Sequence, residues 1–422
     1  LLCLLGILTA PLLVRFLAPG FDQTATDLAV KLTRLLFPYL FLIGLSSTLI
    51  SILNSHDFFF VPGLSSAFLN LAMIMCLGIY VLIDPRSTIE LQITVWSAGV
   101  ILGGILQTIV NFPLLKKIGY KIRLRFTLKG EALRAVWTRF LPGVIGIAIR
   151  QINLAVDLIL ASLLATGSIA ALSYGNRLMQ LPLGIFGVSA GVAVLPLFSR
   201  FISENNWNEL SEKLRFSIIS LSLIMLPITA FLVAAGRDII RLIFLRGAFD
   251  LNSLDMTYSA LLFYSLGLIF FGLTRLLIPL FYAFGNTSTP VKISAFIVAL
   301  NIMLNIILMK YMAHAGLALA TSLSSMIHYF YLRWKLKRKI PALVFPETFS
   351  DLLKISFLAI MILALATFLN FLIPSANIMI VFLKLIIMFL ISSLIMLAGV
   401  RVLRISYGDM ILQRLWKRNL QK

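Results

Sequence analysis

The feature that most constrains this chain is a series of apolar runs of about twenty residues or more, separated by short polar loops. A helix rises about 1.5 Å per residue, so about 20 apolar residues cross the hydrocarbon core of a bilayer. Hydrophobic residues make up 60% of the chain, far more than in a typical soluble domain. A transmembrane β-barrel would instead need alternating segments of about ten residues. The sequence therefore predicts an all-α, polytopic membrane protein.

We predict twelve membrane-spanning helices. The predicted spans are residues 1–17, 32–53, 63–83, 91–113, 141–165, 168–198, 216–235, 257–284, 290–310, 315–334, 352–373 and 377–400. Leu1 lies inside an apolar run with no basic region before it, which does not resemble a signal peptide. We therefore expect the chain to begin part-way through a helix, with N-terminal sequence missing.

Basic residues gather in three segments, which are 114–140, 333–354 and the tail after residue 400. All three fall on one side of the membrane if the predicted spans alternate in direction. Because Lys and Arg in short loops are retained on the cytoplasmic side, we expect a cytoplasmic C-terminus. The segment 236–256 carries three arginines and three aspartates. We expect it to be an external loop with a short interfacial helix and a turn.

The composition disfavours several classes of function. The formal net charge is +20, but the basic residues lie mostly between spans, so a membrane surface explains them better than nucleic acid does. Two cysteines and three scattered histidines indicate neither a disulfide framework nor a metal site. A membrane enzyme acting on lipid-linked sugars would need paired carboxylates, and the sixteen acidic residues form no such cluster. We therefore expect no enzymatic activity, metal or cofactor.

Three charged residues, Arg150, Asp157 and Arg177, lie inside the predicted helical hairpin 141–198. A charge at membrane depth costs about 2.5–3.5 kcal/mol on insertion scales, so such residues usually face a cavity or a partner. A turn at Gly167 places Asp157 and Arg177 level with each other. Arg150 and Asp157 share a helix face but lie about 10 Å apart, too far to pair directly. Two roles stay open for Arg177, which are contact with a substrate and an ion pair with Asp157.

Glycine and proline are dense between residues 182 and 196. Membrane helices tolerate these residues as kinks or as points of close packing. A transporter that alternates between two shapes can use both, and the density here predicts more than ordinary packing.

Several segments, taken in order along the chain, resemble one family. They are AlaProGlyPhe at 18–21, PheProTyrLeu at 37–40, LeuAsn at 53–54, PhePheValProGly at 59–63, LeuAsn at 69–70, LeuLysLysIleGly at 115–119, TyrGlyAsnArgLeuMetGln at 174–180, PheTyrAla at 281–283, ThrProValLys at 289–292 and HisAlaGlyLeu at 314–317. Each is weak alone, but the series with its spacing is specific. The chain resembles the MurJ/MviN family, bacterial flippases for the lipid-linked peptidoglycan precursor lipid II within the multidrug/oligosaccharidyl-lipid/polysaccharide exporter superfamily.

The resemblance implies a fold of fourteen helices, in two pseudo-symmetric bundles with a C-terminal helix pair. On that map this chain begins within the third helix and lacks the first two. It then divides into the remainder of the N-terminal bundle, a basic cytoplasmic loop, the second bundle, a basic cytoplasmic linker and the C-terminal pair with its tail. The corresponding residues are 1–113, 114–140, 141–334, 335–351 and 352–422.

The function that the resemblance implies is movement of lipid II from the inner to the outer leaflet of the bacterial cytoplasmic membrane by alternating access. Expected partners are lipid II, membrane lipids and proteins of cell-wall synthesis or division. In the family, the final helix pair is associated with a hydrophobic groove for the lipid tail. Rival hypotheses are a related exporter of another cargo, such as a polysaccharide-lipid flippase or a drug antiporter, and a non-transporting scaffold. A carrier of cationic drugs would be expected to have acidic cavity positions, which counts against it.

The resemblance also assigns roles to single residues. Arg177 matches an arginine that the family uses in its central cavity, and Arg275 occupies a position where relatives also have a basic residue. Gln180 stands where some relatives have Glu, so it can form hydrogen bonds there but carries no charge. With Arg150 nearby, these side chains are expected to bind the diphosphate of lipid II, because guanidinium groups stay charged and bind phosphate oxygens in pairs. Asp157 is expected to hold Arg177 or Arg150 in place.

Overall fold

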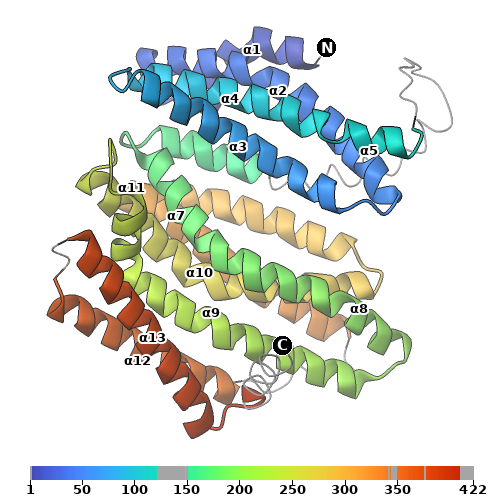
Figure 1. Cartoon of the computed structure of the whole chain (residues 1–422). Coiled ribbons are helices and arrows are strands. Elements are labelled where there is room, and N and C mark those ends of the chain that lie inside the picture. Colours follow the sequence, from blue (N-terminus) through green and yellow to red (C-terminus); the bar gives the residue numbers. More distant parts are fainter. Residues whose placement is uncertain are drawn as a thin grey trace. The chain divides into compact units, whose positions relative to one another are not determined.

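The computed structural model describes most of the chain, namely residues 2–120, 148, 151–340, 343, 349–374 and 377–408. Within these residues the regular structure is helical. The chain forms two compact units, Leu1–Leu141 and Pro142–Lys422, which are described in turn (Figure 1). Nine of the described helices are long and apolar enough to cross a membrane. The prediction of an all-α, polytopic membrane protein is confirmed.

The described residues of the first unit form five helices, which are α1 (Leu2–Leu17), α2 (Gln23–Ser55), α3 (Phe60–Ile83), α4 (Ile89–Ile109) and α5 (Phe112–Lys117). Polar side chains cap the N-termini of two of these helices. The Asp22 carboxylate accepts from the Ala25 N–H at 2.7 Å, and the Thr88 hydroxyl accepts from the Leu91 N–H at 3.4 Å. The bond from Ala25 favours the charged carboxylate and so lowers the pKa of Asp22.

Glycine lets α4 pack closely against α3 and α2. A Cβ atom on Gly103 would lie 2.8 Å from the Leu69 Cα, and one on Gly104 would lie 2.8 Å from a ring carbon of Tyr39. In a membrane, van der Waals packing and interhelical hydrogen bonds hold helices together, so small residues gather at the contacts. Thr108 adds one such bond, from its hydroxyl to the Leu42 carbonyl at 3.3 Å.

The described residues of the second unit include the helical segment Gln151–Ser162, followed by seven labelled α-helices and one π-helix. These are α7 (Ser168–Pro182), η1 (Leu183–Val188), α8 (Ser189–Ser203), α9 (Trp207–Phe244), α10 (Leu251–Ala283), α11 (Ser288–Lys339), α12 (Phe349–Leu372) and α13 (Ile378–Val402). Helix α10 is central, because it packs on α7, η1, α8, α9 and α11. Its side chains Leu261, Leu268 and Leu276 are fully buried.

Helix α11 consists of two arms that meet at Ala313, whose φ of 47° and ψ of −130° are not helical. A straight helix of 52 residues would be about 78 Å long, more than twice the hydrocarbon thickness of a bilayer. The arms instead run antiparallel, since the Asn301 amide donates to the Ser324 hydroxyl, and Gly316 packs directly against the Leu308 carbonyl. The predicted spans 290–310 and 315–334 correspond to these two arms.

The predicted specialisation of residues 182–196 takes the form of a π-helix. The chain passes from α7 through η1 into α8 without a break, and Pro182 immediately precedes η1. Proline has no N–H to donate, so a change of hydrogen-bond register beside it loses little. Gly191 comes so close to α10 that a Cβ there would lie 2.7 Å from the Arg275 carbonyl oxygen.

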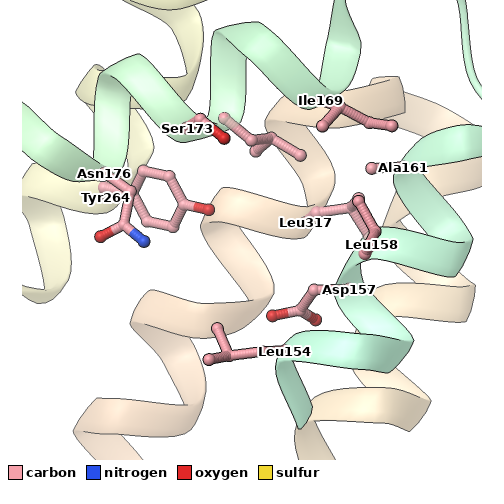
Figure 2. Close-up of a pocket in the computed structure, with 10 residues that line it drawn as sticks. Leu154, Asp157, Leu158, Ala161, Ile169, Ser173, Asn176, Tyr264 and Leu317 are labelled. Carbon is pink, nitrogen blue, oxygen red and sulfur yellow. The ribbon is translucent and has the colours of Figure 1, made fainter. Parts of the chain in front are cut away.

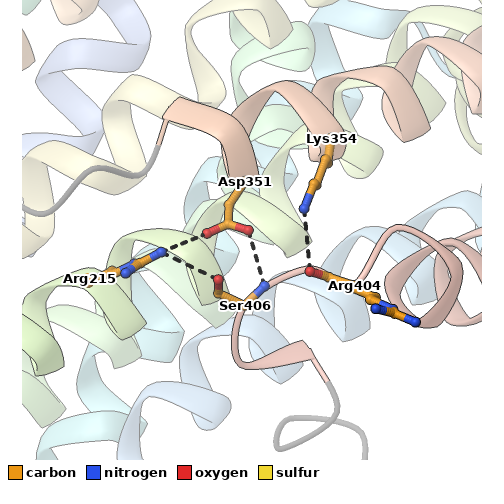
Figure 3. Close-up of polar contacts among 5 residues, drawn as sticks. All are labelled: Arg215, Asp351, Lys354, Arg404 and Ser406. Atoms are coloured by element: carbon orange, nitrogen blue, oxygen red, sulfur yellow. Dashed lines mark hydrogen bonds and ion pairs between the residues drawn. The ribbon is translucent and has the colours of Figure 1, made fainter.

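The C-terminal pair α12 and α13 packs on α9. At one end, Asp351 of α12 accepts from the Arg215 guanidinium of α9 at 3.3 Å and from the Ser406 N–H at 3.1 Å (Figure 3). Farther along the pair, Lys384 of α13 forms a buried ion pair with Asp238 of α9. The two contacts fasten the pair to the rest of its unit.

Two predicted loops are partly helical. In the segment 236–256, α9 continues to Phe244 and α10 begins at Leu251, so no separate interfacial helix forms. Arg237 pairs there with Asp255 at 2.8 Å, which explains the mixture of charges. In the segment 333–354, α11 continues to Lys339, because a run of basic residues with good helix propensity extends the helix beyond the apolar span.

Candidate functional site

The predicted hairpin turns at Gly167, which has a φ of 94° and immediately precedes α7. This left-handed conformation favours glycine, since any side chain would be strained there. The helical segment before the turn carries Asp157, and α7 after it carries Arg177. Arg150 lies outside the described residues.

Asp157 belongs to a chain of polar side chains that joins the hairpin to α11. Its carboxylate accepts from the Asn305 amide at 2.6 Å and from the Asn153 amide at 3.2 Å. Asn305 also donates to the Asn301 side-chain oxygen at 3.1 Å, and Asn301 donates to the Ser324 hydroxyl at 3.3 Å. Asn305 is fully buried. Within the described part of the chain, the partners of Asp157 are amides, and it forms no ion pair with Arg177.

Asn301 and Asn305 are not among the predicted site residues. Both lie on the first arm of α11, in a predicted apolar span. Their spacing of four residues places them on one helix face, which was the available signal.

Asp157 also borders a pocket of about 150 Å³ within the second unit (Figure 2). The polar residues that line it are Asp157, Ser173, Asn176 and Tyr264, and the other lining residues are apolar. Asn176 directly precedes Arg177, so Asp157 lies near the same level of the hairpin, as predicted. The pocket offers a carboxylate, an amide and two hydroxyl groups between the hairpin and α10.

Arg177 and Gln180 lie on an exposed face of α7, together with Ser173. The spacing of four and then three residues places the three side chains along one stripe of the helix. The Gln180 amide donates to the Asn176 side-chain oxygen at 2.8 Å. On the buried side, Gly175 approaches α10 so closely that a Cβ would lie 3.0 Å from the Leu261 nitrogen. The face therefore presents one cation and hydrogen-bonding groups, and among the described residues no carboxylate pairs with Arg177.

Arg275 is an exposed residue of α10 at a different depth from Arg177. Gly175 lies against Leu261 and Gly191 against Arg275, so the helix α7–η1–α8 and α10 run in the same direction. Arg177 precedes Gly191 by 14 residues, which corresponds to about 20 Å along the helix axis. In this conformation the two arginines are therefore separate cationic positions.

The chemistry available here is binding rather than bond cleavage. Among the described residues, no group of three or more His, Cys, Asp or Glu side chains could hold a metal ion. The groups on the α7 face and in the pocket are hydrogen-bond donors and acceptors, with one carboxylate and the two arginines. The two arginines lie on continuous helices of membrane-spanning length, Ser168–Ser203 and Leu251–Ala283. The fold and these residues together define a multi-pass helical membrane protein with a polar binding face.

Comparison with known proteins identifies the family. The family model for lipid II flippase MurJ matches residues 1–409. A probable lipid II flippase MurJ of Buchnera aphidicola subsp. Baizongia pistaciae is 34% identical over 391 residues, which are 92% of this chain and 75% of the relative. A second, of Buchnera aphidicola subsp. Schizaphis graminum, is 33% identical over 424 residues, which are 97% of this chain and 80% of the relative. The chain therefore belongs to the MurJ family of lipid II flippases.

A solved structure agrees with this assignment. The structure of a lipid II flippase MurJ in an inward closed conformation matches with a TM-score of 0.80 at 27% sequence identity. The match covers 97% of this chain and 81% of that structure. The protein is thus a membrane transporter of peptidoglycan biosynthesis and not an enzyme. The resemblance found in the sequence motifs is confirmed.

Proposed function

We propose that Arg177, with Gln180 beside it, contacts the diphosphate of lipid II during its passage across the membrane. The exposed stripe on α7 supports this role, because it holds an intramembrane cation that no carboxylate of the described residues neutralises. A guanidinium group stays charged and can bind two phosphate oxygens at once. Arg150 joins this cationic region in the proposal, because the sequence places it in the predicted hairpin 141–198.

Arg275 is a second binding position for the head group in this proposal. It lies about 20 Å from the level of Arg177 along the helix axis, so one diphosphate would meet the two arginines in turn. With the C-terminus in the cytoplasm, Arg275 lies nearer the inner side and Arg177 nearer the outer side. The head group then passes from Arg275 to Arg177 as the transporter moves lipid II outward.

Asp157 has a positioning role in this mechanism. A carboxylate would repel the diphosphate, and its bonds to Asn305 and Asn153 already use both oxygens. It ties the hairpin that carries Arg177 to α11, and so fixes the hairpin within its bundle. This differs from the ion pair considered for Asp157 from the sequence.

The proposed transport cycle is alternating access by two helix bundles that rock against each other. The π-helix η1 and the bend at Ala313 support it, because such irregularities let a membrane helix change shape. For the lipid tail we propose the apolar groove of about 320 Å³ between α9 and α13, which Pro227, Phe231 and Phe389 help to line.

Complementation tests the role of Arg177. In a bacterium depleted of its own lipid II flippase, the gene with Arg177→Ala should fail to restore growth, while Arg177→Lys should restore it in part. Arg200→Ala is the matched control, since Arg200 is an exposed arginine of the same continuous helix and pairs with Glu204 four residues on. The amount of protein in the membrane should be equal in all variants.

Growth of the Arg177→Ala strain at the rate of the unchanged gene would remove Arg177 from the mechanism. If the unchanged protein is present in the membrane and does not restore growth, another cargo or a scaffold role becomes the better explanation.

A further inference from the structure

A basic pocket lies where α11 both begins and ends. Because the helix reverses at Ala313, its first and last turns come together at one end of the second unit. The pocket has a volume of about 230 Å³ and is lined by Thr289 of the first turn and by Lys335, Arg338 and Lys339 of the last turns.

No carboxylate of α11 balances these charges, since its 52 residues include neither Asp nor Glu. Within the described part of the chain, Lys335, Arg338 and Lys339 form no ion pair with any other helix either. Three cations that converge on one cavity repel each other unless an anion lies among them. The pocket therefore favours an anionic occupant.

Thr289 is oriented for such an occupant by the turn between α10 and α11. The Asn286 amide donates to the Thr289 hydroxyl oxygen at 3.0 Å, and the Asn286 side-chain oxygen accepts from the Thr289 N–H at 3.3 Å. With its oxygen accepting a bond from Asn286, the hydroxyl keeps its own O–H to donate. The pocket thus combines three positive charges with one neutral donor, a set that suits phosphate oxygens.

Trp334 indicates that the pocket lies at the depth of lipid head groups. The residue is 49% exposed, and the charged ends of Lys335 and Arg338 lie 4.9 and 5.6 Å from the centre of its ring. Tyr331 lies one turn earlier, with its ring centre 5.8 Å from that of Trp334. Exposed Trp and Tyr side chains near the end of a membrane helix mark the membrane–water interface.

We propose that this pocket binds the phosphate of an anionic lipid head group. The lipid would bridge the beginning and the end of α11 and so hold its two arms together. The interfacial Trp334 favours a lipid over a free phosphate ion, because the lipid's tails can lie along the apolar surface next to the ring.

The same helix offers a matched control. Lys292 and Lys337 are exposed cations near the same two ends of α11, but neither lines the pocket. The variants Arg338→Gln/Lys339→Gln and Lys292→Gln/Lys337→Gln remove equal charge. A difference between them therefore reports the pocket rather than the general positive charge of the surface.

The test measures binding of short-chain phosphatidylglycerol to the detergent-purified full chain. Thermal unfolding and native mass spectrometry are the two readouts. The unchanged chain and the Lys292→Gln/Lys337→Gln variant should bind it alike. The Arg338→Gln/Lys339→Gln variant should bind about 25-fold more weakly, since each basic residue is worth about fivefold. Phosphatidylcholine, whose choline cancels the phosphate charge, should stabilise all three proteins equally and weakly.

Equal losses of affinity for phosphatidylglycerol in the two double variants would contradict a binding site in the pocket. The binding would then depend only on the general positive charge of the surface. Equal stabilisation by inorganic phosphate at the same concentration would overturn the lipid as the source of the anion. If Arg338→Gln/Lys339→Gln unfolds without lipid, the charge-preserving variant Arg338→Lys/Lys339→Arg replaces it. That variant should bind phosphatidylglycerol within about threefold of the unchanged chain, and a loss of about 25-fold would contradict a charge-based site.

Discussion

The carboxylate of Asp157 is held by amide side chains, and this determines what each neighbouring residue contributes. Asn305 is fully buried and makes the shorter bond, at 2.6 Å, while the bond from Asn153 is 3.2 Å long. Hydrogen bonds between membrane helices contribute about 0.6 kcal/mol on average, but a bond to a charged group contributes about 1.5–3 kcal/mol. The bond from Asn305 should therefore matter more than an average interhelical bond.

Asn305→Ala should lower the free energy of unfolding by about 1.5–3 kcal/mol, because it leaves the Asp157 carboxylate short of a donor inside the bundle. Denaturant unfolding of the purified chain in mixed micelles measures the change. Asn153→Ala is the control at the same carboxylate and should cost less, since its bond is longer. A cost for Asn153→Ala that equals or exceeds that of Asn305→Ala would show that Asn305 is not the main support of Asp157.

The space for an added side chain differs along the continuous helix α7–η1–α8, which packs on α10. Gly184 and Gly191 lie seven residues apart in this helix. A Cβ on Gly184 would meet nothing within 4 Å, while a Cβ on Gly191 would come within 2.7 Å of the Arg275 backbone oxygen. Backbone cannot move aside as a flexible side chain can, so Gly191 fixes the distance between α8 and α10 beside Arg275.

Gly191→Ala should destabilise the protein by about 1–3 kcal/mol, the usual cost of overpacking. It should also reduce growth in the complementation assay, because α8 is pushed away from α10 next to the proposed binding position at Arg275. Gly184→Ala should leave both measurements unchanged or raise stability slightly, since alanine is the better helix former. Equal behaviour of the two variants would mean that the contact at Gly191 is not tight.

The C-terminal helix pair is attached to the body of the second unit by charges as well as by apolar packing. Lys384 and Asp238 are both buried, with side chains 2% and 9% exposed, and they join α13 to α9. The contact between Arg215 and Asp351 lies nearer solvent, with 34% of the Arg215 side chain exposed. A buried charge that loses its partner is far more costly than a partly solvated one. The pair at Lys384 should therefore dominate the attachment.

Lys384→Met should lower the free energy of unfolding by about 3–5 kcal/mol, because it removes the cation that is paired with the buried carboxylate of Asp238. The double variant Lys384→Met/Asp238→Leu should recover most of that loss, since apolar side chains replace both charges. Arg215→Met should cost less than Lys384→Met, because Asp351 keeps its bond from the Ser406 N–H. Unfolding in mixed micelles measures all three, and a double variant as unstable as Lys384→Met would contradict the pairing.

The apolar runs determined the helices, because a stretch of that length and composition has no other way to satisfy its backbone in a bilayer. The motif around Arg177 and the turn at Gly167 could also be predicted from the sequence, since both depend on local residue types. Even the reversal within α11 was visible, as the break between two predicted spans around Ala313. The helices, the turn and the break could be predicted because each depends on residues that are close together in the sequence.

The partners of the charged residues were decided only by the tertiary structure. Asp157 takes its shortest bond from Asn305, which lies 148 positions along the chain, and Lys384 takes its partner from α9. The spacing of Arg177 and Arg275 along the helix axis likewise depends on which turns of α8 and α10 touch. A helix pattern fixes which face is apolar, but the residue it meets depends on how the helices pack against each other, and that is settled by contacts between distant segments.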